Sequence, residues 1–562
     1  MDSLQKVENR EMFRAKVNSQ LVANKTERVE EGEEIWVKMK DCLTEVADEI
    51  LGKEYSKRKQ KWMTMEIMEL MESRRKYKDS NSEQGRTMYK DLKRKIQSLC
   101  RKAKDDFFNN KCRELEELDK AHSNRLYDKV KEFKHTGNRV SQPIKDKNGQ
   151  ILLTVDETLE RWAEYVEMLY QDEERTNVIK EAQEGEVYRI SQEEIKAIIK
   201  ELPKGKACGS DNIPAELLQC LEGEGLDILT KLINKIYNSG QIPQDFRDSL
   251  FVPIPKLPRA SDCSDYRTIA LISHASKILL QLIKKRITPS IERQLSDSQM
   301  GFRKGKGTRD AIFQLRQIGE RMAQMGKELV VCFVDYQKAF DRVSHDKLVE
   351  VMEKAELPEL EMNLIRNLYW NQRASVRWDR NVSRPFEIQK GVRQGCIISP
   401  ILFNLYSEFM IMEALDEMEG VKINGVNLTN LRYADDTVIL AENVENLQAM
   451  MESLNNKCKE YGMAINAKKT MVMVIGAKAE TKCNITIDGL ALEQVKRYKY
   501  LGSWITEDVR CDTEVTTRIA MAKTAFWQNK EIMRRNVRHE TKLKILNCYV
   551  FSVLNYGCES WT

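Results

Sequence analysis

The sequence predicts an α+β protein, and three observations support this prediction. Residues 8–135 are almost free of glycine and proline and rich in Glu, Lys, Arg, Met and Leu, which are good helix formers. The run ELVVCFVD at 328–335 is β-branched and aromatic and favours a buried strand. The run LRYADDTVIL at 431–440 places an acidic pair between two hydrophobic runs, as in a β-hairpin.

Length and composition indicate a large folded protein. At the usual ~100–200 residues per domain, 562 residues suggest about three or four folding units. A content of 41% hydrophobic and 32% charged residues excludes a disordered, collagen-like or disulfide-dense chain. The 13 cysteines include no Cys-x-x-Cys pair and indicate a reducing compartment, so we expect a cytoplasmic or nuclear location. Neither a signal-peptide core nor an apolar run of about 18 residues occurs, so we expect no membrane contact.

Charge is distributed unevenly along the chain. The net charge is only +5, but residues 51–110 hold 17 Lys/Arg against 9 Asp/Glu, whereas residues 151–200 hold 6 against 13. Within the basic stretch, apolar residues recur at helical spacing on one stripe: Leu92, Ile96, Leu99, Ala103 and Phe107. Two interpretations remain open at this point: an ordinary amphipathic helix with a solvated basic face, or a helical arm along a nucleic-acid backbone.

The later elements follow from turn formers and hydrophobic rhythm. Turn formers at 136–150 mark a boundary, and helical patterns resume from there to about residue 245. They are interrupted by the glycine-containing loop 204–214, where backbone amides could receive a phosphate. Three prolines at 253, 255 and 258 predict short extended pieces. Beyond residue 325 short strands alternate with helices.

Three aspartates stand at the ends of these predicted strands. Asp335 ends the first run, and Asp435 and Asp436 form the acidic pair of the hairpin. Adjacent carboxylates in an apolar hairpin repel each other, and a divalent cation relieves this cost. Such a group could hold two Mg²⁺ ions about 3.5–4 Å apart for phosphoryl transfer. The alternative is an Asx turn that only reverses the hairpin.

The residues around these carboxylates resemble the motifs of reverse transcriptases. Asp335–Asp341 (DYQKAFD) and Tyr433–Asp436 (YADD) are similar to the two metal-binding motifs, and Gly391–Asn404 is similar to the glycine-glutamine-glycine motif between them. The order and spacing most resemble the polymerases of non-LTR (LINE-type) retrotransposons, from about residue 200 to the end. Further segments resemble the fingers motifs, the later palm motifs and the primer grip: 266–271, 299–305, 462–470 and 500–502.

The resemblance implies a right-hand polymerase fold and a domain order. We expect fingers at 201–320, a palm at 321–505 and a partial thumb at 506–562. Two regions precede them: a helical, basic, linker-like region at 1–135 and an acidic connecting region at 136–200. The basic region is expected to contact the template RNA. Compared with the family, the chain is expected to be C-terminally truncated and to lack the upstream endonuclease domain.

The implied activity is that of an RNA-directed DNA polymerase, a nucleotidyltransferase that extends a primer 3′-hydroxyl with dNTPs by two-metal phosphoryl transfer. Asp335, Asp435 and Asp436 correspond to the ligands of two Mg²⁺ ions, for which Mn²⁺ is a possible substitute. Lys469 corresponds to the lysine that protonates the departing pyrophosphate. Asp341 is expected to have a structural role.

The resemblance also assigns residues to substrate binding. Phe340 corresponds to the aromatic gate against a ribose 2′-hydroxyl, and Gln394 and Gly395 to the lining of the nascent base pair. Three cations are candidates for gripping the triphosphate: Arg267, Arg303 and Lys304. The expected partners are an RNA template, a DNA primer or target and dNTPs, and the oligomeric state is open. Two alternatives remain: a truncated, non-catalytic relic that binds RNA, and a helical scaffold.

Overall fold

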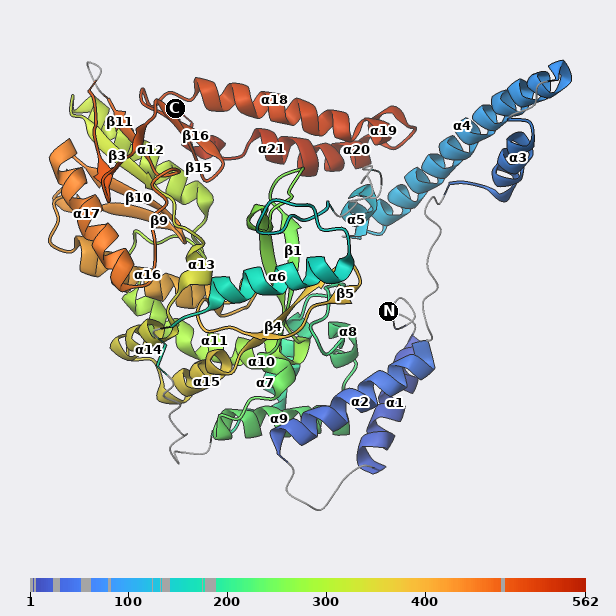
Figure 1. Cartoon of the computed structure of the whole chain (residues 1–562), viewed down its shortest axis with the longest axis horizontal. Coiled ribbons are helices and arrows are strands. Elements are labelled where there is room, and N and C mark those ends of the chain that lie inside the picture. The colour runs from blue at the N-terminus through green and yellow to red at the C-terminus, as the bar shows by residue number, and fades with distance from the viewer. Residues whose placement is uncertain are drawn as a thin grey trace. The chain divides into compact units, whose positions relative to one another are not determined.

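The computed structural model confirms a mixed α+β architecture (Figure 1). It describes residues 4, 7–23, 31–51, 62–78, 82–123, 125–131, 133, 142–173, 175–176, 188–476 and 481–561. The chain divides into two compact units, which we call unit 1 (residues 1–53 and 140–510) and unit 2 (residues 54–139 and 511–562). None of the helices in the described part of the chain is long and apolar enough to span a bilayer.

A five-stranded sheet in unit 1, here called the palm sheet, has the order β14-β11-β3-β10-β9. Its strands are β3 (Leu329–Val334), β9 (Asn430–Tyr433), β10 (Asp436–Ala441), β11 (Met471–Ile475) and β14 (Glu493–Gln494). Neighbouring strands are antiparallel except for the parallel pair β11 and β14. Every residue of β3 is buried, so the predicted strand at 328–335 is confirmed as the sheet's centre.

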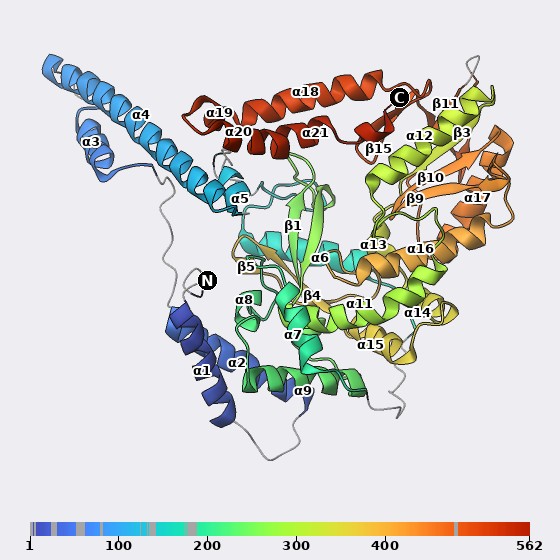
Figure 2. The same ribbon diagram turned by 180° about the vertical axis from the view of Figure 1, so that it is seen from behind.

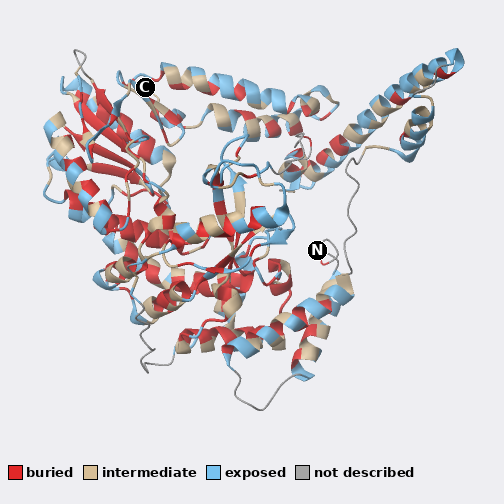
Figure 3. Ribbon diagram, in the orientation of Figure 1, coloured by how far each residue is buried: buried red, intermediate tan, exposed pale blue. Residues whose placement is uncertain are grey.

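Helices cover the palm sheet on both faces. Cys332 and Val334 of β3 share a hydrophobic core with α16 (Ser399–Leu415) and α17 (Val444–Glu460). The alternate residue Phe333 stacks on Tyr498, with ring centroids 4.0 Å apart. On this opposite side, α12 (Thr308–Gln324) contacts β3 and β9. The sheet is therefore a buried layer between helices, as its colouring in Figure 3 shows.

A second sheet in unit 1 has the order β2-β1-β4-β5, with β6 also paired to β4. Its strands are β1 (Ser249–Pro255), β2 (Tyr266–Leu271), β4 (Arg373–Trp378), β5 (Asn381–Val382) and β6 (Phe386–Glu387). The helix α6 (Val155–Tyr170) begins at a capping box in which Thr154 and Glu157 bond each other's backbone N–H. Its aromatic face packs on this sheet, with Trp162 edge-on to Tyr266 at 5.3 Å.

The remaining elements of unit 1 complete its core. Trp36 of α2 packs edge-on against Phe246 and donates a 2.8 Å hydrogen bond to Asp245, so the first helices belong to unit 1. The helices are α1 (Val7–Ala23), α2 (Gly32–Leu51), α7 (Gln192–Glu201), α8 (Ala215–Leu218), α9 (Glu224–Ser239), α10 (Gln244–Arg247), α11 (His274–Gln294), α13 (Ala339–Arg342), α14 (His345–Lys354) and α15 (Glu359–Trp370). The short strands are β7 (Val421–Ile423), β8 (Val426–Leu428), β12 (Thr486–Ile487), β13 (Leu490–Ala491), β15 (Arg497–Tyr500) and β16 (Ser503–Thr506).

Unit 2 joins two segments that are far apart in the sequence, 54–139 and 511–562. The first contributes α3 (Met65–Lys76), α4 (Glu83–Lys120) and α5 (Arg125–Lys131), and the second α18 (Asp512–Gln528), α19 (Lys530–Arg534), α20 (His539–Leu546) and α21 (Ser552–Leu554). Figure 2 shows α5 and the end of α4 beside α19 and α20. Their common core is apolar: Cys112, Leu115, Leu126, Val130, Phe133, Ile532, Val537 and Ile545. The buried Asp119 carboxylate accepts a 2.6 Å hydrogen bond from Thr541 across this contact.

This division differs from the domain order expected from the sequence. The helical region expected at 1–135 is split, because residues 1–53 pack in unit 1 and 54–139 in unit 2. The expected partial thumb does not form a unit of its own, because residues 511–562 pack with the basic helices. The predicted apolar stripe on α4 is confirmed, since its five residues are buried or half-buried whereas Lys93, Arg94 and Lys95 are exposed.

Candidate active site

The acidic hairpin is held in one conformation by the loop that precedes α12. Ala434 and Asp435 form a two-residue turn between the paired residues Tyr433 and Asp436, and Ala434 has a φ of +59°. The side-chain oxygen of Gln299 accepts hydrogen bonds from the Ala434 N–H at 3.0 Å and from the Gly301 N–H at 2.9 Å. A Cβ atom on Gly301 would lie 2.3 Å from the Ala434 nitrogen, so only glycine fits this approach.

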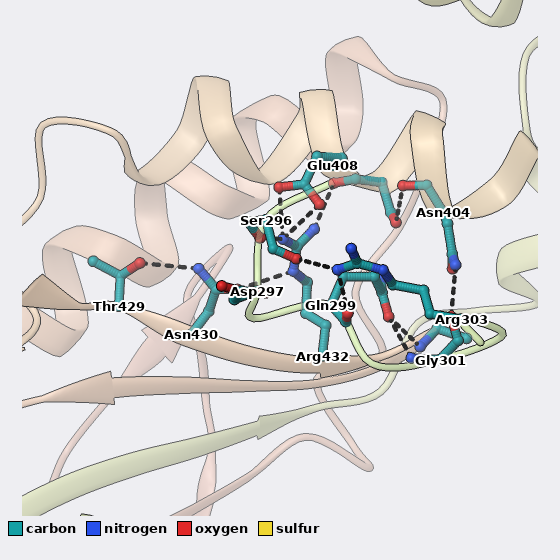
Figure 4. Close-up of polar contacts among 12 residues, drawn as sticks. Ser296, Asp297, Gln299, Gly301, Arg303, Asn404, Glu408, Thr429, Asn430 and Arg432 are labelled. Carbon is teal, nitrogen blue, oxygen red and sulfur yellow. Dashed lines mark hydrogen bonds and ion pairs between the residues drawn. The ribbon is translucent and has the colours of Figure 1, made fainter. Parts of the chain in front are cut away.

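A buried ion pair between Arg432 and α16 supports the same hairpin (Figure 4). Nη2 of Arg432 lies 2.9 Å from both carboxylate oxygens of Glu408 on α16, and these side chains are 1% and 7% exposed. Arg432 also donates to Asn430 at 2.9 Å and to Ser296 at 2.8 Å. Sequence reasoning missed this pair, and the available signal was a charged residue inside an apolar strand.

Strand register brings the third aspartate to the hairpin. Thr437 pairs with Val334 in the antiparallel ladder of β10 and β3, so the next step places Asp436 opposite Asp335. The Asp335 carboxylate accepts a 3.1 Å hydrogen bond from Asn466, and its N–H donates to the Thr470 hydroxyl at 3.2 Å. The three predicted carboxylates therefore gather at one end of the palm sheet.

The electrostatics of this group oppose its full ionisation. Solvent reaches Asp435 and Asp436, but the surrounding protein removes much of their water. This desolvation, together with the charges of Asp435 and Asp335, raises the pKa of Asp436 to about 6. Desolvation and the Asp335 charge also raise the pKa of Asp435, whereas the nearby Arg267 guanidinium opposes this rise.

The three carboxylates fit a divalent cation by their chemistry. They are hard oxygen donors that share a repulsion which a cation relieves. In the described part of the chain, no three Asp, Glu, His or Cys side chains form a ready-made metal cage. Such a group needs further oxygen ligands, and water and substrate phosphates are the usual ones for Mg²⁺.

The loop that carries Gln394 and Gly395 packs on the second sheet and on α6. The Gln394 carbonyl accepts a 2.8 Å hydrogen bond from the Ala270 N–H of β2. Gly395 has a φ of +108°, and a Cβ there would lie 2.9 Å from the Ala270 carbonyl oxygen. The Gln394 side chain donates to Asp341 at 3.2 Å. Asp341 also accepts a hydrogen bond from the Tyr170 hydroxyl, and these contacts support its expected structural role.

Phe340 lies in an aromatic cluster next to the first acidic motif. Its ring stacks on Phe403 of α16 at a centroid distance of 4.4 Å and an interplanar angle of 15°. The exposed ring of Phe302 meets it edge-on at 6.5 Å. Phe340 is half-buried, so its ring is anchored by packing while part of it stays accessible.

Of the three cations predicted to bind the triphosphate, two are exposed and one is held by hydrogen bonds. Arg267 is exposed on β2 and lies close enough to Asp435 to act on its pKa. Arg303 donates hydrogen bonds to Glu292 at 2.9 Å and to the Ser296 carbonyl at 2.7 Å. These bonds stabilise the conformation of its loop. Lys304 is exposed three residues after the buried Gly301.

Lys469 belongs to a cationic group that the sequence did not reveal in full. It is exposed at the turn before β11, where its N–H donates to the Asn466 carbonyl at 3.0 Å. Burial lowers the pKa of Lys256, and the charges of Lys338, Arg267 and Lys469 lower it further. Lys338, Arg267 and Lys469 therefore all lie within electrostatic range of Lys256, and two of these four cations, Lys256 and Lys338, were missed by sequence reasoning.

An acidic group at the end of an antiparallel sheet, with cations and an aromatic cluster near it, is the arrangement expected for the palm of a nucleotide polymerase. Residues 254–505 match the family described as reverse transcriptase (RNA-dependent DNA polymerase). This part of the chain is therefore similar to a reverse transcriptase domain, and the match covers β3, the acidic hairpin and the loop of Gln394.

Curated relatives confirm the resemblance to non-LTR retrotransposon polymerases. The RNA-directed DNA polymerase from mobile element jockey of Drosophila funebris is 25% identical over 381 residues, 66% of this chain and 41% of that protein. The probable RNA-directed DNA polymerase from transposon BS of Drosophila melanogaster is 28% identical over 57% of this chain and 36% of that protein. The Pol polyprotein from the type-1 retrotransposable element R2 of Nasonia vitripennis is 28% identical over 56% and 31%.

The chain thus spans less than half of the length of these relatives. Among solved structures, an apo telomerase from Candida tropicalis, truncated from the C-terminal domain, aligns with a TM-score of 0.37 and 12% identity. That alignment covers 61% of this chain and 85% of the telomerase chain.

Proposed function

We propose that this chain is an RNA-directed DNA polymerase of a non-LTR retrotransposon, which extends a primer 3′-hydroxyl with dNTPs on an RNA template. The observation that carries the proposal is the strand register that sets Asp436 opposite Asp335, with Asp435 in the adjoining turn. The reverse transcriptase match over 254–505 supports the choice of template and product.

The acidic group would hold divalent cations, Mg²⁺ with Mn²⁺ as a substitute, through Asp335, Asp435 and Asp436. When bound, such cations lower the pKa of the primer hydroxyl and neutralise charge on the phosphates. Asn466 and Thr470 keep Asp335 oriented for this task, and Gln299 does the same for the turn that carries Asp435.

The cationic group would bind the incoming triphosphate. Arg267 and Lys256 supply positive charge to the phosphate oxygens. Bond formation joins the primer 3′-oxygen to the α-phosphorus and releases pyrophosphate, to which Lys469 would donate a proton. Gln394 and Gly395 would line the nascent base pair, and the Phe340 ring would exclude a 2′-hydroxyl.

A primer-extension assay tests the proposal. Purified protein is given poly(rA) primed with oligo(dT), dTTP and Mg²⁺ or Mn²⁺, beside an Asp435→Ala/Asp436→Ala variant. Asp416→Ala serves as a matched control, because Asp416 is an exposed aspartate at the end of α16. Extension by the wild type and the control but not by the double variant is expected.

Two outcomes would contradict polymerase activity. One is equal extension by all three proteins, which would point to a contaminating activity. The other is no extension by the wild type while it still retards RNA in a gel, which would indicate an RNA-binding protein without catalysis.

A further inference from the structure

Unit 2 contains a pocket of about 800 Å³ formed by both of its chain segments. It is lined by Arg101, Lys104, Asp105, Phe108, Phe133, Trp527, Gln528, Lys530, Glu531 and Arg535. The volume falls in the range of about 300–1,000 Å³ that is usual for ligand sites. None of these residues lies in the reverse transcriptase match, and none takes part in the candidate active site.

The apolar part of the pocket is aromatic. Phe108 and Phe133 stack at a centroid distance of 5.7 Å and an angle of 29°, and they are anchored in the core of unit 2. Trp527 stands at the end of α18 and is 59% exposed, which leaves a large flat indole accessible. An exposed aromatic face beside buried rings offers a surface on which a planar group can stack.

The polar part of the pocket is mainly cationic. Arg101 and Lys530 are exposed, and neither has an ion pair or a hydrogen bond with the described residues. Arg535 is paired with Asp105 at 2.9 Å, and its guanidinium lies over the Phe108 ring at 5.2 Å. Its Nε is buried and has no hydrogen-bond partner among the described residues.

We infer that this pocket binds one unpaired nucleotide of a single-stranded nucleic acid. Its base stacks on Trp527, and the adjoining phosphates contact Arg101 and Lys530. Four cations against two carboxylates favour a polyanion over a peptide or an apolar ligand. Both carboxylates are paired with Arg535, Asp105 at 2.9 Å and Glu531 at 3.9 Å. Stacking on aromatic rings between basic side chains is the usual way in which proteins hold single strands.

This inference does not depend on polymerase activity, so binding is measured without dNTPs. The full chain is titrated into a fluorescein-labelled, unstructured oligouridylate, into the matching oligothymidylate and into a blunt RNA duplex. The variants are Trp527→Ala, the conservative Trp527→Phe, and Arg101→Ala/Lys530→Ala. The controls are Phe551→Ala, an exposed aromatic residue in unit 2 outside the pocket, and Lys93→Ala, an exposed cation on α4 outside it.

Trp527→Ala is expected to weaken single-strand binding about tenfold, the usual effect of removing one stacking ring, with duplex binding unchanged. Trp527→Phe should retain most of the affinity. Arg101→Ala/Lys530→Ala should reduce the salt dependence of log K by about 0.7 for each lost phosphate contact. The two oligonucleotide arms decide whether RNA or DNA is preferred.

Equal single-strand affinity in Trp527→Ala and the wild type would overturn the inference. A loss that is the same for single strands and the duplex would also overturn it, because a stacked unpaired base would then be absent. If Lys93→Ala reduces the salt dependence as much per charge as the double variant does, the pocket is only part of a general basic surface. Thermal melting of each variant verifies folding.

Discussion

The Tyr170 hydroxyl donates a 2.7 Å hydrogen bond to the Asp341 carboxylate, although the two residues are 171 positions apart in the chain. The same carboxylate oxygen accepts from Gln394 at 3.2 Å. Burial raises the pKa of both Tyr170 and Asp341. A helix outside the reverse transcriptase match therefore helps to position the loop proposed to line the nascent base pair.

Tyr170→Phe should reduce the free energy of unfolding by about 1.5–3 kcal/mol, because a buried hydrogen bond to a carboxylate is lost. The loosened Gln394 loop should raise the KM for dNTP with little change in primer binding. Urea denaturation and steady-state extension measure the two effects. Tyr188→Phe is the control, since Tyr188 is 46% exposed; equal effects of both variants would refute the positioning role.

The Gly301→Ala substitution should lower the extension rate on the order of a hundredfold, the effect of roughly 1 Å misplacement of a reacting group. The new Cβ would collide with the Ala434 backbone and displace the turn that carries Asp435. Single-turnover extension measures the rate. Gly307→Ala is the control, because its Cβ would meet only a side-chain oxygen of Asp310 at 3.6 Å; a normal rate in Gly301→Ala would contradict this account.

Removing one partner of the buried Arg432–Glu408 ion pair should lower the free energy of unfolding more than replacing both partners with apolar residues. Arg432→Met should reduce the free energy of unfolding by about 3–5 kcal/mol, because Glu408 is left as a buried unpaired charge. Adding Glu408→Leu should recover much of this loss. Urea denaturation compares the variants. The control is the exposed ion pair Lys354–Glu350, whose loss should lower the free energy of unfolding by about 1 kcal/mol or less. No recovery in the double variant would show that the wider hydrogen-bond network dominates.

Acid should destabilise the protein through His345. This ring is fully buried against the Gly391 carbonyl, 2.9 Å from its Nε2, and burial lowers the pKa of His345 to about 3. A depressed histidine pKa means that the unfolded chain binds the proton first, from about pH 6.5 downward. Its stabilisation is therefore complete above pH 6.5 and falls as the pH drops toward 3, by about 2 kcal/mol at pH 5.

His345→Gln should remove this part of the pH dependence. Urea denaturation at pH 7 and pH 5 compares each protein with itself, so other titrating groups cancel in the difference between the two proteins. An unchanged pH dependence in the variant would show that His345 does not titrate in this range.

Phe340→Ala should admit ribonucleotides more readily, because the ring that is proposed to exclude the 2′-hydroxyl is removed. The measured quantity is the ratio of rUTP to dTTP incorporation on poly(rA) primed with oligo(dT). Phe313→Ala on α12 is the control, since this ring is 43% exposed and lies outside the aromatic cluster. Unchanged discrimination in Phe340→Ala would assign the ring to packing alone.

Local sequence patterns predicted the parts of the molecule that depend on neighbouring residues. The strand ending at Asp335 and the hairpin that carries Asp435 and Asp436 are both present, as is the apolar stripe of α4. Each follows from hydrophobic periodicity, which residues a few positions apart express directly. The α+β class and the family resemblance rest on the same segments and are confirmed.

Contacts between distant segments were decided only by the tertiary structure. The sequence did not indicate that Arg303 bonds Glu292, that Tyr170 reaches Asp341, or that Arg432 pairs with Glu408. It also did not indicate that the basic helices fold with residues 511–562. The sequence by itself determined which carboxylates carry the proposed chemistry. Packing decided what surrounds them, because buried partners are chosen by shape and charge across the fold, and no local periodicity records that choice.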